Sequence, residues 1–329
     1  MPRLLVFNPE HDYALAHGGA HYMAPLSVRS LSTRLQLLPL LWSEEKDYIL
    51  LDSNRIVSAA DIAAGSVNEA ASEIETVEPW GWDAALIERL RTIGVTLSVL
   101  PTREYIDRVR QLSHRRISIE ANRKMNSPSL PQEFFSVEEA LQFSRDNPGC
   151  YFKLPWSSGG RGVVATKELN ERQIAEWVSG AIRRQGSVIG EKEVDRTLDF
   201  SSLWTVGPNN VEFRGFSISL SDGRGKYGGN LAGCQERILS EIHKYAPSFS
   251  TSLIDQQRSF IEDDIMSHYA GPLGIDMMCS RDGEVFPCVE INLRRTMGHA
   301  AISFAALPPE KRLELKKLIP MEGVLIWIE

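Results

Sequence analysis

The chain has 329 residues, of which 43% are hydrophobic and 24% are charged, as in soluble globular proteins that fold without covalent cross-links. Its 36 lysine and arginine residues against 43 aspartate and glutamate residues give a net charge of −7, which disfavours nucleic acid and anionic membranes as partners. The four cysteines form no CxxC pair, which indicates reduced thiols, and no apolar run approaches the about 20 residues of a membrane span. We therefore expect a cytoplasmic protein with roughly two domains.

The first stretch of the chain alternates short β-rich runs with helical ones. The pattern predicts strands at residues 4–7, 48–51 and 95–100 and helices at residues 26–42 and 82–93, with Gly94 ending the second helix. Such alternation is typical of a parallel sheet with crossover helices.

A polar loop follows the first strand, at the place where open α/β sheets bind ligands. It contains Asn8, Glu10 and Asp12, which are candidate substrate contacts. His11, His17 and His21 also make a zinc site an alternative. Their spacing disfavours it, because it does not place the three histidines on one helical face. A purely structural loop is the third alternative.

The second stretch is predicted to contain strands at residues 151–153 and 163–166 and helices at residues 137–145 and 171–184. Between its strands lies a loop of small residues directly after a lysine. Glycines and serines let the backbone approach an anion closely, and a lysine neutralises phosphate oxygens. The loop is not of the Walker A or dinucleotide type, because its lysine precedes the glycines and no helix follows. A plain hairpin turn remains the alternative. The residues concerned are Lys153, Ser157, Ser158, Gly159, Gly160 and Gly162.

The third stretch is predicted to form two hairpins, at residues 212–234 with a turn at 222–225 and at residues 275–292, with one helix at residues 254–269 between them. For the second hairpin we predict a three-residue turn ending at Gly283, because that register collects the apolar residues, Val289 among them, on one face. Asp276 then pairs with Cys288, and Asp276, Glu290 and Asn292 share the other face. Three hard oxygen ligands suit Mg²⁺, and a solvated polar face is the alternative.

A lysine–glycine loop followed by an Asp…Glu-x-Asn hairpin resembles the ATP-grasp superfamily, over about residues 114–297. The resemblance implies a parallel α/β domain at residues 1–112, then a small ATP-grasp subdomain at residues 113–190 and a large one at residues 191–329. ATP would lie between the two subdomains.

The resemblance also implies roles for individual residues. Asp276, Glu290 and Asn292 would bind magnesium, Lys153 and Arg294 would be catalytic, and Arg295 would compete with Arg294 for a substrate carboxylate. The family's usual first lysine is replaced by Arg115 or Arg116, which departs from the pattern. The residues implied to contact ATP are Arg116, Lys153, Ser157, Ser158, Gly159, Gly160, Gly162, Glu191, Glu193 and Asp195.

The activity implied is ligation of a carboxylate to an amine-type nucleophile through an acyl phosphate, with ATP and Mg²⁺ as cofactors. Phosphoryl transfer depends mainly on positioning and charge neutralisation, which fits a chain without a recognisable nucleophilic triad. A phosphotransferase on the same scaffold and a nucleotide-binding protein with decayed catalysis are the alternatives. The expected partner is a small-molecule or peptide substrate, and the resemblance also allows a homodimer.

Overall fold

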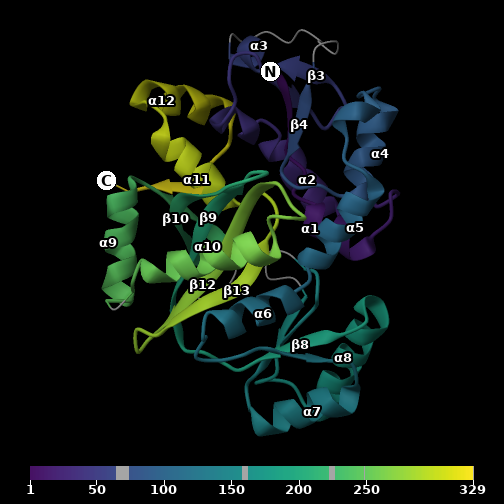
Figure 1. Cartoon of the computed structure of the whole chain (residues 1–329), viewed down its shortest axis with the longest axis vertical. Coiled ribbons are helices and arrows are strands. Elements are labelled where there is room, and N and C mark those ends of the chain that lie inside the picture. Colours follow the sequence, from purple (N-terminus) through teal and green to yellow (C-terminus); the bar gives the residue numbers. More distant parts are fainter. Residues whose placement is uncertain (64–73, 158–161, 222–226, 248, 329) are drawn as a thin grey trace.

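The computed structural model describes residues 1–63, 74–157, 162–221, 227–247 and 249–328. The predicted turn at residues 222–225 lies outside these ranges, as do Ser158, Gly159 and Gly160 of the predicted glycine loop. Three sheets organise the described chain, and Figure 1 shows them following one another along the long axis of the molecule.

The N-terminal sheet has four strands in the order β3-β2-β1-β4. β1 pairs in parallel with β2 and β4, which confirms the predicted parallel sheet, and β3 adds an antiparallel edge. The elements of this region are β1 (Arg3–Val6), α1 (His11–His17), α2 (Leu26–Leu35), the 3-10 helix η1 (Leu38–Leu41), β2 (Tyr48–Leu50), β3 (Ile56–Ser58), α3 (Ala59–Ala63), β4 (Thr76–Pro79), α4 (Ala84–Thr92), the 3-10 helix η2 (Leu97–Val99) and α5 (Arg103–Leu112).

The predicted strand at residues 95–100 is wrong, and the fourth strand is β4 instead. The apolar run follows the end of α4 and contains η2. Gly94 adopts a positive φ of 83°, and the Val95 amide donates to the Leu90 carbonyl while the Gly94 amide donates to Arg91. This pair of bonds is a Schellman motif, which turns the chain back so that the residue after the glycine packs on the helix. Val95 accordingly lies in the same apolar cluster as Leu90.

The second sheet is small, with the strand order β5-β8-β6-β7. The predicted strands and helices of this stretch are present, and β5, β8 and α6 are additional. A ring cluster of Phe134, Phe143 and Phe152 forms the centre of its core. The elements are α6 (Arg116–Lys124), β5 (Gln132–Phe134), α7 (Val137–Asp146), β6 (Tyr151–Lys153), β7 (Val163–Ala165), α8 (Glu171–Gln185) and β8 (Val188–Glu191).

The third sheet has six strands in the order β13-β12-β9-β10-β11-β14. Both predicted hairpins are present, but the sequence did not reveal β9, which joins them, and two helices rather than one separate them. The elements are β9 (Arg196–Val206), β10 (Val211–Ser221), β11 (Tyr227–Ala232), α9 (Gln235–Tyr245), α10 (Ser252–Asp264), β12 (Gly271–Ser280), β13 (Val285–Asn292), α11 (Met297–Ala306), α12 (Pro309–Leu318) and β14 (Leu325–Trp327).

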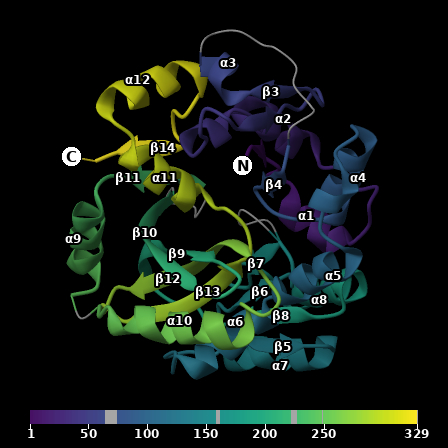
Figure 2. The ribbon, with the colours of Figure 1, turned by 45° about the horizontal axis from the view of Figure 1, so that its top comes forward.

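Two apolar cores connect these regions. Helix α6 packs on β13, and its Ala121 and Met125 join the core beneath the large sheet. At the other end of the molecule, Phe304 of α11 and Leu315 of α12 share one core with Trp80 and the η1 region, and Figure 2 shows α12 beside the N-terminal elements. The predicted domain boundaries at residues 112 and 190 stay predictions. Within the described residues, no helix is long and apolar enough to cross a membrane.

Candidate active site

The β12–β13 hairpin carries the candidate metal ligands, and its turn is the predicted one. The Ser280 amide donates to the Glu284 carbonyl at 2.9 Å, and Gly283 has a φ of 81°. Beyond the turn the predicted register is wrong, because Asp276 pairs with Glu290 and not with Cys288. A bulge opposite Met277 accounts for the shift.

The bulge also changes which side chains share a face. Cys288 and Val289 are consecutive, yet both line the same hollow with Met278 and Phe286. The prediction that placed Val289 on the opposite, apolar face is therefore wrong at this point. A regular strand alternates its side chains between faces, and a bulge interrupts that alternation.

Asp276 is held by neighbouring polar side chains. One carboxylate oxygen accepts from Ser201 Oγ at 2.7 Å and the other from Asn292 Nδ2 at 3.0 Å. Burial raises the pKa of Asp276 to about 6, and the negative charge of Glu290 acts in the same direction. The hairpin thus brings the three predicted ligands together and leaves two carboxylates whose mutual repulsion a bound cation would relieve.

Lys153 ends β6 and points to the end of the neighbouring strand β8. Its Nζ lies 2.5 Å from Glu191 Oε2, and both side chains are largely buried. Asp199 of β9 lies near the same lysine: burial raises the pKa of this carboxyl, while the charges of Arg196 and Lys153 oppose that rise.

Of the two candidate arginines, the structure brings Arg115 into the site. Its guanidinium donates to the Leu154 carbonyl at 2.5 Å, to Ser157 Oγ at 2.7 Å and to Glu290 Oε1 at 2.8 Å. Its buried Nε has no hydrogen-bond partner in the described part of the chain. Arg116, which the sequence favoured, is half exposed and pairs with Glu133.

The ends of the glycine loop are well defined. Ser157 is buried, and the Leu154 amide donates to the Gly162 carbonyl at 2.8 Å. Gly162 has a φ of 77°, and a side chain there would meet Leu154 and Ser157 within 3 Å. A glycine is therefore required where the loop rejoins β7.

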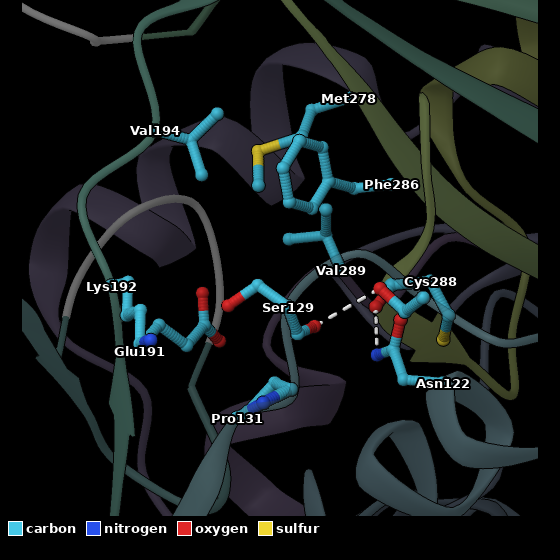
Figure 3. A pocket seen from close by; sticks show the side chains of 11 residues that line it. Asn122, Ser129, Pro131, Glu191, Lys192, Val194, Met278, Phe286, Cys288 and Val289 are labelled. Atoms are coloured by element: carbon cyan, nitrogen blue, oxygen red, sulfur yellow. Dashed lines mark hydrogen bonds between the residues drawn. The ribbon is translucent and has the colours of Figure 1, made fainter. Parts of the chain in front are cut away.

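A hollow lies between the small sheet and the hairpin (Figure 3). One wall is the end of β8, at Glu191, and the segment after it, with Lys192 and Val194. The opposite wall is apolar and consists of Met278 and Phe286 with the residues of the bulge, and Asn122 closes it from α6 by donating to the Cys288 carbonyl. An apolar slot with a few polar groups at its edge is typical of a small-molecule site.

Two of the predicted ATP contacts lie on the surface. Glu193 is 40% exposed and lies 3.4 Å from Lys167 Nζ. Asp195 is 68% exposed, and Arg281 at the hairpin turn pairs with it at 2.7 Å. Neither lines the hollow of Figure 3, whereas Glu191 does.

Arg294 and Arg295 face different partners. Arg294 donates from Nε and Nη2 to the carboxylate of Asp12 in α1, at 2.9 and 2.7 Å. A second hollow near this pair is lined by side chains of Asp12, Trp156, Ser157, Glu290 and Asn292, among others. Arg295 instead pairs with Glu78 and stacks on Trp42, 4.5 Å from its ring centre.

The expected N-terminal polar loop is in part a helix, because residues 11–17 form α1. Asn8 is buried and donates to the Gly81 carbonyl and to Asp83, so its side chain fixes the β4–α4 connection. His11 is buried against Asp83, and burial raises the pKa of Glu10. Within the described ranges, no group of three or more histidine, cysteine, aspartate or glutamate side chains is arranged to hold a metal ion, a finding that lends no support to the zinc reading.

Sequence reasoning missed the residues contributed by β9, Asp199 and Ser201. Asp199 pairs with Met278 across the sheet and Ser201 pairs with Asp276, so β9 forms the floor beneath the candidate metal ligands. The signal for this strand in the sequence is the short alternation of apolar and polar residues at 198–201.

The chain matches no known family in a family scan and no curated protein in a sequence search. Solved structures, by contrast, resemble it over most of its length. An N5-carboxyaminoimidazole ribonucleotide synthetase in complex with ADP has a TM-score of 0.51 at 12% identity and covers 93% of this chain and 78% of its own. An N5-carboxyaminoimidazole synthetase from Staphylococcus aureus, also with ADP, has a TM-score of 0.50 at 8% identity and the same coverage of 93% and 78%.

A biotin carboxylase from Campylobacter jejuni in complex with β-γ-ATP has a TM-score of 0.50 at 12% identity, and covers 94% of this chain and 72% of its own. These proteins are ATP-grasp enzymes. The expectation drawn from the motifs is therefore confirmed at the level of the fold: the chain has the ATP-grasp fold with a preceding α/β region.

Proposed function

We propose that the chain is an ATP-dependent ligase that joins a carboxylate to an amine-type nucleophile through an acyl phosphate. The observation that carries this proposal is the convergence of cationic and anionic side chains from different lobes. Lys153 directly precedes the glycine loop, and Arg115 contacts the first part of that loop at Leu154 and Ser157. Arg115 also reaches Glu290, which pairs with Asp276. Cations suited to phosphates thus adjoin carboxylates suited to a metal ion.

ATP is proposed to lie between the small sheet and the hairpin. The apolar wall of Met278 and Phe286 suits the faces of a purine, and the backbone around Lys192 suits its polar edge. Lys153 and Arg115 would then bind the phosphates, and the unpartnered Nε of Arg115 leaves a donor for that purpose. Ser157, Gly162 and the glycine-loop residues between them would cover the phosphates.

Mg²⁺ fits the donor set of the hairpin. Asp276, Glu290 and Asn292 offer hard oxygen atoms, and burial of Asp276 beside the charge of Glu290 raises the pKa of its carboxyl, a cost that a bound cation would offset. The ion supplies charge neutralisation on the transferred phosphoryl group. Arg115 and Arg294 would add positive charge at the same end of the nucleotide, with Asp12 orienting Arg294.

The proposed reaction forms and breaks bonds in two steps. A substrate carboxylate oxygen attacks the γ-phosphorus of ATP, the bond to the β-phosphate oxygen breaks, and ADP leaves. The amine nitrogen then attacks the acyl carbon and loses a proton, and inorganic phosphate leaves. The hollow beside Asp12 and Trp156 borders Glu290 and Asn292, which makes it the proposed entry for the carboxylate.

The test is to incubate the protein with Mg-ATP and pools of amino acids, peptides and amines, and to follow ADP and phosphate together. A ligase releases both in equal amounts, whereas a phosphotransferase releases ADP alone. Binding of nucleotide without turnover in any pool would favour decayed catalysis over the proposed ligase.

Two variants connect that assay to the site. Glu290→Ala is expected to abolish magnesium-dependent turnover, and Lys153→Ala to weaken ATP binding. Lys124→Ala is the matched control, because Lys124 also forms a 2.5 Å ion pair, with Asp264, but on the surface. Full activity of Glu290→Ala would contradict the metal assignment.

A further inference from the structure

Two buried side-chain amides donate hydrogen bonds to the bulge of β13. Gln257 of α10 donates from Nε2 to the Pro287 carbonyl at 2.9 Å, and Asn122 of α6 donates to the Cys288 carbonyl. Both side chains are almost fully buried, at 0% and 2% exposure. A bulge leaves backbone groups without partners in the ladder, and these amides satisfy two of them.

The bulge decides which residue faces Asp276. Cys279 pairs with Val285 and Met278 with Phe286, but Asp276 pairs with Glu290, so Met277 alone faces residues 287–289. Without the bulge, the register set at the turn would place Glu290 opposite Gly274, about 7 Å farther along the strand. The two carboxylates lie directly opposite each other only because the bulge persists.

Gln257 is itself fixed by a chain of buried donors. Trp204 Nε1 donates to Ser202 Oγ at 2.9 Å, and Ser202 Oγ donates to Gln257 Oε1 at 2.7 Å. This series of hydrogen bonds makes the amide oxygen of Gln257 the acceptor, so the amide nitrogen of Gln257 faces Pro287. Gln257 Nε2 also lies 3.3 Å from Met277 Sδ, on the strand opposite the bulge.

We infer that Gln257 and Asn122 are positioning residues that hold the bulge and thereby set Glu290 across from Asp276 for binding of a divalent cation with the nucleotide. The inference rests on the proposed function. Neither side chain is among the proposed metal ligands, so both would affect the metal site through the backbone of β13. Partners that orient metal ligands commonly change metal affinity by about 10–100-fold when they are removed.

The test measures ADP binding by calorimetry at increasing Mg²⁺ concentrations. Gln257→Met keeps the length and volume of the side chain and removes the donor. We expect it to raise the Mg²⁺ concentration for half-maximal binding about tenfold or more, and to change binding without Mg²⁺ less than about twofold. If Gln257 had only a structural role, its substitution would change ADP binding with and without Mg²⁺ to the same extent.

Gln235→Met is the matched control. Gln235 also holds a strand backbone, at Phe216 of β10 beside another irregularity, with contacts of 2.7 and 3.1 Å. It is expected to leave the Mg²⁺ dependence unchanged. Asn122→Ala is the second test variant and is expected to shift the dependence in the same direction as Gln257→Met.

The outcomes separate this inference from the proposed function. Absence of Mg²⁺-dependent ADP binding in the unaltered chain would overturn both. Normal Mg²⁺ dependence in the unaltered chain and in folded Gln257→Met or Asn122→Ala would overturn the positioning role alone. If neither variant folds, the two amides are required for folding itself and the positioning role is rejected.

Discussion

Arg115 joins the glycine loop to the β12–β13 hairpin of the candidate site. It contacts the stem of the glycine loop at Leu154 and Ser157 and reaches Glu290 on the hairpin. A planar guanidinium presents several donors in fixed directions, which a lysine cannot reproduce. With ATP bound as proposed, Arg115 would therefore neutralise both a phosphate and the neighbouring Glu290 carboxylate.

Arg115→Lys is accordingly expected to weaken ADP binding by about tenfold, because charge-assisted hydrogen bonds contribute about 1.5–3 kcal/mol each and only part of them is lost. Calorimetry with Mg-ADP measures the effect. Arg116→Lys is the control, since Arg116 is half exposed and pairs with Glu133 alone among the described acidic residues. Equal effects of both substitutions would contradict the assignment of Arg115 to the site.

His114, next to this arginine, predicts a pH dependence of stability. Burial lowers the pKa of His114 to about 4, and the charge of Arg116 acts in the same direction. The unfolded chain binds a proton there near pH 6.5 but the folded chain does not, so the free energy of unfolding falls as the pH drops from 6.5 toward 4. One such histidine changes the free energy of unfolding by at most about 1.4 kcal/mol per pH unit.

His114→Gln is therefore expected to make the decline in unfolding free energy between pH 7 and pH 5 shallower, as measured by urea denaturation. His268→Gln, at an exposed histidine, provides the comparison and should retain the slope of the unaltered chain. An unchanged slope in His114→Gln would show that this histidine does not control the acid response.

At the scale of elements, the stem of the glycine loop depends on a backbone that only glycine tolerates. Gly162 and Gly94 both have a positive φ, 77° and 83°, but only at Gly162 would a side chain collide with neighbours, at 2.8 Å from Leu154 and 2.9 Å from Ser157. The strained φ alone costs about 1 kcal/mol or slightly more for alanine. The collision at Gly162 additionally displaces Ser157, a partner of Arg115.

Gly162→Ala is thus expected to weaken nucleotide binding several-fold, whereas Gly94→Ala lowers the melting temperature without changing binding. Parallel titrations with ADP and thermal unfolding of the two variants give the comparison. Unaltered ADP affinity in Gly162→Ala would argue against a role of the loop stem in holding the nucleotide.

The elements that the sequence predicted are those whose patterns are local. The turn at Gly283 follows from residue types at adjacent positions and is confirmed, while the structure describes the two ends of the lysine–glycine loop, at residues 153–157 and at Gly162. The register beyond the turn depends on contacts from distant segments. These are the side-chain amides of Asn122 in α6 and Gln257 in α10, which donate hydrogen bonds to the backbone of the bulge. Pro287 is the one local indication of the bulge in this hairpin, because proline within a strand is confined to edge strands and bulges.

Strand β9 escaped prediction for a related reason. It lies between β10 and β12, and serines 201 and 202 are buried among its apolar residues, so its pattern shows no clean polar face. Those serines are buried because Asp276 and Gln257 accept their hydrogen bonds. Partners supplied by distant segments cannot be read from the strand itself, and the same holds for the choice between Arg115 and Arg116.

At the scale of the whole molecule, the N-terminal region depends on segments from the other end of the chain. Leu35, Leu38 and Trp80 share one buried core with Phe304 of α11 and Leu315 of α12. Figure 2 shows α12 beside the N-terminal elements. The small sheet has a separate core around Phe152. Shared cores unfold together, and separate cores can open independently.

Phe304→Ala is therefore expected to cost about 3–5 kcal/mol of stability, the usual effect of emptying a buried phenylalanine site. Amide hydrogen exchange should show lost protection both in the N-terminal sheet and in α12, because the cavity lies in the core that joins them. Phe152→Ala removes the same side chain from the small sheet and should increase exchange in β6 and β8 while sparing the N-terminal sheet. Equal loss of protection throughout the chain in both variants would mean that the molecule unfolds as one unit and that the small sheet is no independent lobe.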